Sequence, residues 1–218
     1  MKAIFEQIVT AWIGGNCLGC GLSCGSDEFC GICEKGIEWD VERLKSGYSV
    51  YKYADIIRKV IISAKFGPSE IKARSLLRYT FRSSQGIEII EQLAQEKAEC
   101  ICFVPVHWRR RISRGFDLSA LLANELRNQL KIPIYYAIRC ARQEDPSTLT
   151  QSKSDRVKRI QDRFRLNRNY PHHKKVILVD DIITTGITIS TVSQLLMNQG
   201  CEVKAFTLAR NPLNTQKR

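Results

Sequence analysis

Apolar residues recur along this chain in patterns that predict alternating helices and buried strands. Apolar positions three and four residues apart predict three consecutive helices over 54–65, 70–81 and 87–97. Uninterrupted apolar runs over 100–106 and 176–179 predict strands that are covered on both faces, as in parallel sheets. The other predicted elements are strands over 48–53, 134–138 and 202–208 and helices over 118–130 and 187–198.

Strands that alternate with helices indicate an α/β fold with a doubly wound, mainly parallel sheet. The chain has 218 residues, enough for such a domain and a small module beside it. We expect a cysteine module with a short N-terminal helix over residues 1–45 and the α/β domain over 46–218. The polar, basic segment 143–168 fits either a helix or a loop.

The chain shows no sign of a membrane or secretory segment. No stretch approaches the roughly 20 apolar residues that a membrane-spanning helix requires. The N-terminal stretch is moderately apolar, but Glu6 and Gln7 interrupt it and no small-residue cleavage site follows. We therefore expect a cytoplasmic protein without membrane insertion.

The formal net charge of +12 is concentrated in one part of the chain. Residues 105–175 hold 17 Lys and Arg against 6 Asp and Glu. Such a field attracts polyphosphates or nucleic acid, and the sequence does not separate these two ligands. The density of Arg109, Arg110, Arg111 and Arg114 favours contact with a polyanion over a merely solvated helix face.

Paired carboxylates and a threonine-rich turn follow the strand predicted over 176–179. Asp180 and Asp181 come directly after it, and Thr184-Thr185-Gly186-Ile187-Thr188 leads into the next helix. Backbone N–H groups at a helix N-terminus receive a phosphate, and glycine allows a close approach. Adjacent carboxylates can each accept a bond from one ribose hydroxyl and favour a positive charge developing on the sugar. A simple helix cap explains one such residue but not the whole set, and no Walker-type Gly-Lys follows.

Five of the nine cysteines fall within 17 residues. Cys17 and Cys20 form one CxxC pair and Cys30 and Cys33 another, nine residues apart. Two such pairs predict a four-thiolate zinc site, which is structural because it leaves no open coordination position. Cys24 either replaces one ligand or remains a free thiol.

Three features in this order resemble the ComF family of ComFC/GntX-like competence proteins: the paired CxxC module, a central arginine motif, and a loop similar to the signature of type I phosphoribosyltransferases. The resemblance covers most of the chain. Asp117-Leu118 stands where the family usually has Asn-Gln. The central motif consists of Pro105, Arg109, Arg110 and Arg114-Gly115-Phe116, and Lys65-Phe66-Gly67 resembles the family's Lys-aromatic-x-Gly motif.

The resemblance implies a phosphoribosyltransferase fold that binds phosphoribosyl pyrophosphate with Mg²⁺. By position, Asp180 and Asp181 would hold the ribose and act in any catalysis, and residues 184–188 would hold the 5′-phosphate. The polyanion or pyrophosphate contacts would be Lys65, Arg109, Arg110 and Arg114.

Members of the family are linked to natural competence, the handling of imported DNA for transformation. The resemblance therefore implies single-stranded DNA as a ligand and a ComFA-like helicase or another DNA-processing protein as a partner. The alternative is an active metabolic phosphoribosyltransferase that transfers ribose 5-phosphate to a nucleobase or an amine and does not act on DNA. Whether the protein is an enzyme stays open at this point.

Overall fold

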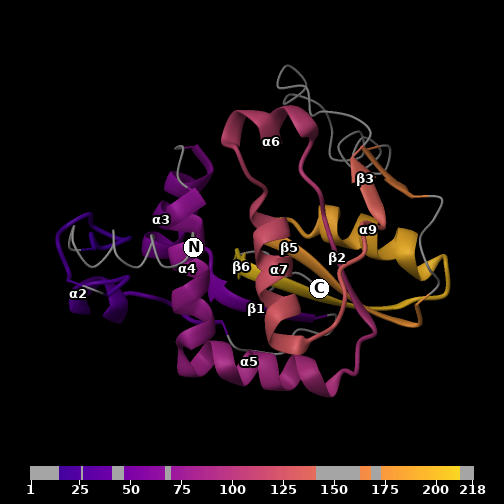
Figure 1. Ribbon diagram of the computed structural model, residues 1–218, viewed down its shortest axis with the longest axis horizontal. Coiled ribbons are helices and arrows are strands. Elements are labelled where there is room, and N and C mark those ends of the chain that lie inside the picture. Colours follow the sequence, from indigo (N-terminus) through magenta and orange to yellow (C-terminus); the bar gives the residue numbers. More distant parts are fainter. Residues whose placement is uncertain are drawn as a thin grey trace, which may run out of the picture.

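A four-stranded parallel sheet forms the centre of the protein. The computed structural model describes residues 15–25, 27–40, 47–66, 70–140, 163–167 and 173–211. The strand order is β1-β6-β5-β2, and all three neighbouring pairs are parallel. This arrangement confirms the predicted α/β fold (Figure 1). The strands are β1 (Gly47–Lys52), β2 (Cys100–Phe103), β5 (Lys175–Ile183) and β6 (Glu202–Arg210).

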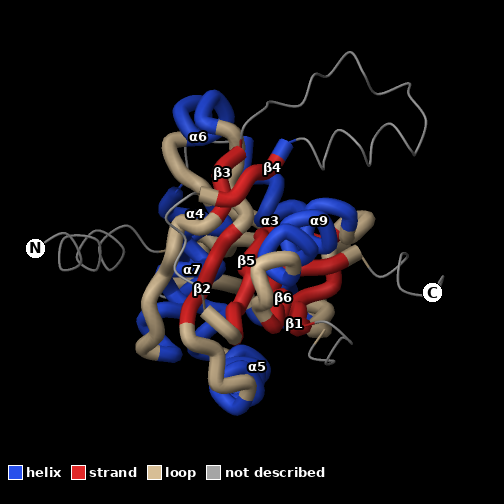
Figure 2. The backbone as a smooth tube through the Cα atoms, turned by 90° about the vertical axis from the view of Figure 1, so that its right-hand side faces the viewer, coloured by secondary structure: helices blue, strands red, loops and turns tan. Residues whose placement is uncertain are grey.

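Helices pack on both faces of this sheet, as the uninterrupted apolar runs of β2 and β5 require (Figures 1 and 2). Four helices share one core with one face of the sheet. On the other face, α9 (Ile187–Met197) packs beside a two-stranded antiparallel sheet of β3 (Ile138–Cys140) and β4 (Phe164–Leu166). The four helices of the first face are α3 (Asp55–Phe66), α4 (Glu70–Arg82), α5 (Ser84–Gln95) and α7 (Leu118–Leu130).

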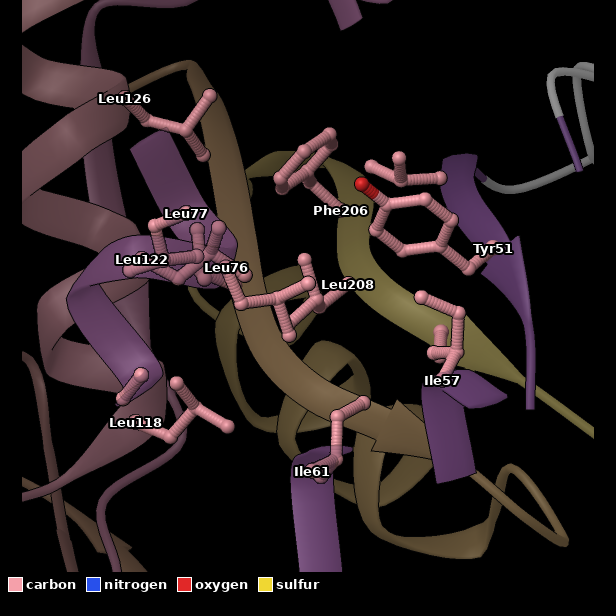
Figure 3. Packing of buried hydrophobic residues seen from close by; sticks show 14 of the residues in the cluster. Tyr51, Ile57, Ile61, Leu76, Leu77, Leu118, Leu122, Leu126, Phe206 and Leu208 are labelled. Carbon is pink, nitrogen blue, oxygen red and sulfur yellow. The ribbon is translucent and has the colours of Figure 1, made fainter. Parts of the chain in front are cut away.

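The larger core lies between the four helices and the sheet (Figure 3). Leu76 of α4 and Leu122 of α7 are fully buried together with Phe206 of β6. Each such side chain contributes about 1.5–3 kcal/mol of transfer free energy. Tyr51 is also fully buried, and its hydroxyl lies 2.9 Å from the Oγ1 of Thr80, so its polar end has a hydrogen-bond partner.

The structure corrects the prediction at several places. The strand expected over 176–179 extends to Ile183, so Asp180 and Asp181 lie within β5 and not after it. The strand expected over 134–138 is wrong: within the described residues Ile134 forms an isolated bridge to Ile101, and β3 begins only at Ile138. The strand expected over 100–106 is shorter, because β2 ends at Phe103, two residues before Pro105, which has no N–H to donate to a ladder.

Two helices have no counterpart in the prediction. They are α2 (Gly31–Lys35) in the cysteine module and α6 (Trp108–Arg114) after β2. Both are short, and neither has the apolar stripe that makes a helix readable from sequence. The predicted N-terminal helix and most of segment 143–168 lie outside the described residues. Where that segment is described, residues 164–166 form strand β4 and not the expected helix or loop. Within the described part of the chain, none of the helices combines the length and apolar character that crossing a bilayer requires.

Candidate functional site

Two different helices hold the two carboxylates of the acidic pair. Asp180 and Asp181 lie in the C-terminal part of β5. The Oδ1 of Asp180 accepts hydrogen bonds from the Ser119 hydroxyl at the start of α7, at 3.2 Å, and from the Asp181 backbone N–H, at 2.9 Å. The Oδ2 of Asp181 lies 2.7 Å from the Nζ of Lys65 in the last turn of α3. The lysine and aspartate side chains are 15% and 13% exposed, so this ion pair is largely shielded from water.

The environment of Asp180 favours its protonated form. Burial, with the negative charge of Asp181 adding to it, raises the pKa of Asp180 to about 8, although the Asp181 N–H, Lys65 and Ser119 act in the opposite direction. At neutral pH one carboxyl of the pair is therefore mostly protonated, while the other is matched by the Lys65 ammonium. An anionic ligand can approach this pair without meeting two uncompensated negative charges.

The loop after β5 brings backbone N–H groups next to the acidic pair. Thr184 and Thr185 are exposed, and Gly186 stands at the N-cap of α9 in a left-handed conformation, with φ of 73°. Glycine adopts this conformation without the steric cost of a side chain. Gly186 supplies no side-chain cap, so the first-turn N–H groups of α9 are available to an anion. The structure thus places Asp180, Asp181 and residues 184–188 around the end of one strand.

Arg114 lies beside the end of α3, next to the residue that follows Lys65. Its guanidinium carbon lies 5.5 Å from the ring centre of Phe66, the residue after Lys65. Burial and the neighbouring Arg110 lower the pKa of Arg114, and Asp181 and Asp117 oppose that shift, which places this arginine within the field of the acidic pair.

Arg109 packs against its neighbour Trp108 on α6. Its guanidinium carbon lies 5.3 Å from the ring centre of Trp108, and the indole is 57% exposed. All seven residues of α6 remain at least partly exposed, and the helix stands above the carboxyl edge of the sheet (Figure 1). Capping holds it in place, because the Nδ1 of His107 accepts from the Arg109 N–H and Gly115 ends the helix with φ of 79°.

Sequence reasoning missed two residues that shape the site. Asp117 caps α7 by accepting from the Ser119 N–H, at 3.0 Å, and its other oxygen accepts from the Val106 N–H, also at 3.0 Å. It thereby ties the segment after β2 to the helix that carries Ser119. The Ser119 hydroxyl then reaches Asp180, 61 residues away in sequence. The capping position of Asp117 could have been read from the sequence, but the contact of Ser119 could not.

The four cysteines of the paired CxxC motif form one cluster. The sulfur atoms of Cys17, Cys20, Cys30 and Cys33 all lie within 4.8 Å of one another, and those of Cys20 and Cys30 are 3.8 Å apart. A tetrahedral zinc with Zn–S bonds of about 2.3 Å requires sulfur separations of about 3.8 Å. The cluster could therefore bind a metal such as zinc. Cys24 lies outside it, with its thiol donating to the carbonyl of Asp27 at 3.0 Å.

The charges around the thiols fit a cation. Burial raises the pKa of the Cys17 thiol, but the backbone N–H groups of Cys30, Cys20 and Gly19 outweigh that effect and bring it to about 6. Burial, together with the neighbouring thiols, raises the pKa of Cys33 to about 12. Four thiols in one site cannot all ionise without a positive charge between them, and a zinc ion supplies that charge.

Comparison with known proteins adds a family and two relatives. Residues 113–218 match the phosphoribosyl transferase domain family. The chain is 28% identical over 209 residues to competence protein F of Haemophilus influenzae, with 90% of each chain covered. It is 29% identical over 213 residues to the DNA utilization protein YhgH of Salmonella typhi, covering 89% of this chain and 83% of that protein. A purine phosphoribosyltransferase structure from Pyrococcus horikoshii Ot3 superposes with a TM-score of 0.39 at 19% identity, covering 64% of this chain and 76% of that one.

Proposed function

Because this chain is a homologue of the ComF/YhgH competence and DNA utilization proteins and carries a phosphoribosyltransferase domain, we propose that it binds phosphoribosyl pyrophosphate and handles single-stranded DNA. The observation that carries the first part is the placement of Asp180 and Asp181 beside the N-terminus of α9. The carboxylates can accept hydrogen bonds from two hydroxyl groups of a ligand, and the adjacent loop can bind a phosphate group of the same ligand.

The parts of the ligand are assigned by their chemistry. Asp180 and Asp181 take the two ribose hydroxyls, and residues 184–188 take the 5′-phosphate through backbone N–H groups and threonine hydroxyls. Lys65 neutralises Asp181, and Arg114, which lies within the field of Asp181, supplies a positive charge for the pyrophosphate. Mg²⁺ enters with the ligand and is held mainly by the ligand's own oxygens, because the carboxylate oxygens that bind Ser119 and Lys65 are already engaged.

Calorimetry tests the ligand assignment. Phosphoribosyl pyrophosphate with Mg²⁺ is titrated into the wild type and into Asp180→Asn/Asp181→Asn, which keeps the shape of the side chains and removes their charge. The matched control is Glu88→Gln/Glu91→Gln, which removes two exposed carboxylates from α5. We expect saturable binding in the wild type and the control and its loss in the aspartate variant. Equal affinity in all three would refute the assignment.

The surface of α6 supports the second part of the proposal. It presents exposed Arg109 and Arg111 beside the exposed indole of Trp108. Cationic side chains that follow a phosphate backbone, with an aromatic ring on which a base stacks, are the usual elements of single-strand binding. The net charge of +12 adds a long-range attraction for the same ligand.

Fluorescence anisotropy with a labelled single-stranded oligonucleotide tests this surface. Affinity should fall steeply as salt rises, and Arg109→Ala/Arg111→Ala should reduce the slope of log K against log salt by about 0.7 for each lost phosphate contact. Arg58→Ala/Arg82→Ala removes two exposed arginines from α3 and α4 and serves as the control. If the two variants lose affinity equally, α6 has no specific role. No binding at about 50 mM salt would rule out DNA as a ligand.

Catalysis is the second candidate function, because the same acidic pair can stabilise a positive charge that develops on the sugar. Under this proposal the protein displaces pyrophosphate from its ligand with a nucleobase or an amine. A panel of bases and amines is incubated with protein, ligand and Mg²⁺, and pyrophosphate release is measured. Release that depends on one acceptor and is absent in Asp180→Asn/Asp181→Asn supports an enzyme. Binding without release supports a module that senses the ligand.

A further inference from the structure

One helix contacts both the cysteine module and the acidic pair. Near its start, Ile56 of α3 lies so close to Gly19 and Gly36 of the module that an added Cβ at those glycines would fall 3.2 Å and 2.7 Å from its side chain. At its end, Lys65 pairs with Asp181. The helix has 12 residues, so these contacts are separated by most of a length of about 18 Å.

Lys65 compensates a charge that would otherwise face an anionic ligand. Asp181 is 13% exposed, and its Oδ2 has the Lys65 ammonium at 2.7 Å. Without this lysine the Asp181 carboxylate would lie partly buried beside Asp180 and would lose its ion-pair partner. Both the orientation of the carboxylate and the charge balance of the site therefore depend on where the end of α3 lies.

We propose that Lys65 is a positioning residue that holds Asp181 for its ligand, and that the four-cysteine module controls this position through α3. The proposal rests on the function proposed above, and it adds that metal loss in the module weakens ligand binding at the acidic pair. The module then does more than stabilise its own fold.

The packing of the module explains why α3 depends on it. The module also contacts α4, where Arg78 donates to Glu28 at 2.7 Å and the ring of Tyr79 meets that of Phe29 at 4.8 Å. A cavity of about 430 Å³ lies between the module and α3 and α4, but Phe29, Cys33 and Ile37 of the module belong to the same buried core as these helices. These contacts require a folded module, and a four-thiolate module loses its fold when the metal leaves. Lys65 stands in the last turn of α3, so a shift of that helix moves it.

A thermodynamic cycle tests the proposal through the affinity for phosphoribosyl pyrophosphate with Mg²⁺. Its four proteins are the wild type, Lys65→Met, Cys20→Ala and the double variant, all as full-length chains. Lys65→Met and Cys20→Ala should each weaken binding by about tenfold, within the usual range for coupled sites. The double variant should be little weaker than Lys65→Met alone, because the module acts through that lysine. Fully multiplicative losses would refute the route through Lys65.

Matched variants separate this role from general effects. Lys59→Met removes an exposed ammonium from the same helix and should leave the affinity within about twofold. Lys65→Arg keeps the charge and should restore most of the affinity. Cys20→His keeps a ligand that zinc accepts, so it should retain the metal and the affinity. Metal content by atomic absorption and folding by near-ultraviolet circular dichroism are measured for each protein.

A second readout needs no ligand and so separates this proposal from the proposed function. The carboxyl carbon of Asp180 is titrated by NMR in the wild type, Lys65→Met and Cys20→Ala. Lys65 lowers the pKa of Asp180, so removing the lysine should raise that pKa further. Cys20→Ala should raise it in the same direction if metal loss moves Lys65. An Asp180 pKa unchanged in Cys20→Ala would overturn the coupling, whether or not the wild type binds phosphoribosyl pyrophosphate.

Discussion

A buried ion pair joins the end of the cysteine module to the end of the sheet. Arg210 is the last residue of β6, and its guanidinium group binds the carboxylate of Asp40 through two hydrogen bonds. Its Nε donates to Oδ2, and its Nη2 donates to Oδ1 at 2.6 Å. The two residues are 9% and 4% exposed. They are 170 positions apart, so the pair closes a contact that the local sequence does not specify.

Replacing Asp40 by alanine should destabilise the protein strongly. The Arg210 guanidinium would lose its carboxylate partner while remaining buried, and breaking a buried pair in this way costs about 3–5 kcal/mol. For a chain of this size that corresponds to a fall in melting temperature of roughly 6–20 °C. Urea unfolding of the zinc-loaded protein, followed by circular dichroism, measures the change in the free energy of unfolding.

Glu38→Ala is the matched control for Asp40→Ala. Glu38 lies two residues away and pairs with Lys52 at 3.1 Å, but its side chain is 47% exposed and that of Lys52 is 42% exposed. Such a surface pair contributes about 0–1 kcal/mol. Asp40→Leu/Arg210→Met removes both charges and should recover part of the lost stability. A cost for Asp40→Ala no greater than that for Glu38→Ala would refute the reasoning.

Three further results are expected. A strong chelator should release one zinc ion per chain and lower the melting temperature, because the four-thiolate module folds around its metal; release without any change in melting would contradict this. Folding raises the pKa of Asp180, so the folded state holds the proton of this carboxyl more tightly than the unfolded state does. The stability that this proton contributes is fully present below the unfolded pKa near 4 and is lost as pH rises through about 8. Compared with Asp180→Asn, the wild type should therefore lose stability between pH 4 and 8, measured by urea unfolding, and parallel pH profiles would argue against a raised pKa. Gly186→Ala forces a side chain into a left-handed conformation and should cost about 1–2 kcal/mol and weaken ligand binding, which thermal melts and calorimetry can check. An unchanged affinity would mean that the loop does not receive the phosphate.

The sequence by itself determined the features that depend on neighbouring residues. The apolar runs of β2 and β5 predicted a parallel sheet, because strands buried on both faces have no polar alternation. The succession of strand, acidic pair, threonine-rich turn and helix placed Asp180, Asp181 and Gly186 together, since one short continuous segment carries all of them. The doubled CxxC spacing identified the four cysteines that cluster.

Short elements without an apolar stripe were beyond the reach of the sequence pattern. α6 is held by the His107 cap and the left-handed Gly115, and nothing in its arginine-rich composition shows a helical period. β3 and β4 have three residues each, so no alternation can be counted before the two strands pair. Their position depends on the partner strand and on the α9 face of the core.

Only the tertiary structure decided which charged and polar residues meet. The sequence motif indicated Lys65 only as a contact for an anion, and the fold placed it on Asp181. Ser119 contacts Asp180 and Asp40 contacts Arg210, each across distant segments of the chain. Cys24 lies outside the four-cysteine cluster because a local turn directs its thiol to the carbonyl of Asp27. A hydrogen bond or an ion pair forms only when both partners lie within about 3–4 Å. A parallel fold brings such partners together from far apart in the sequence, and no local pattern records that distance.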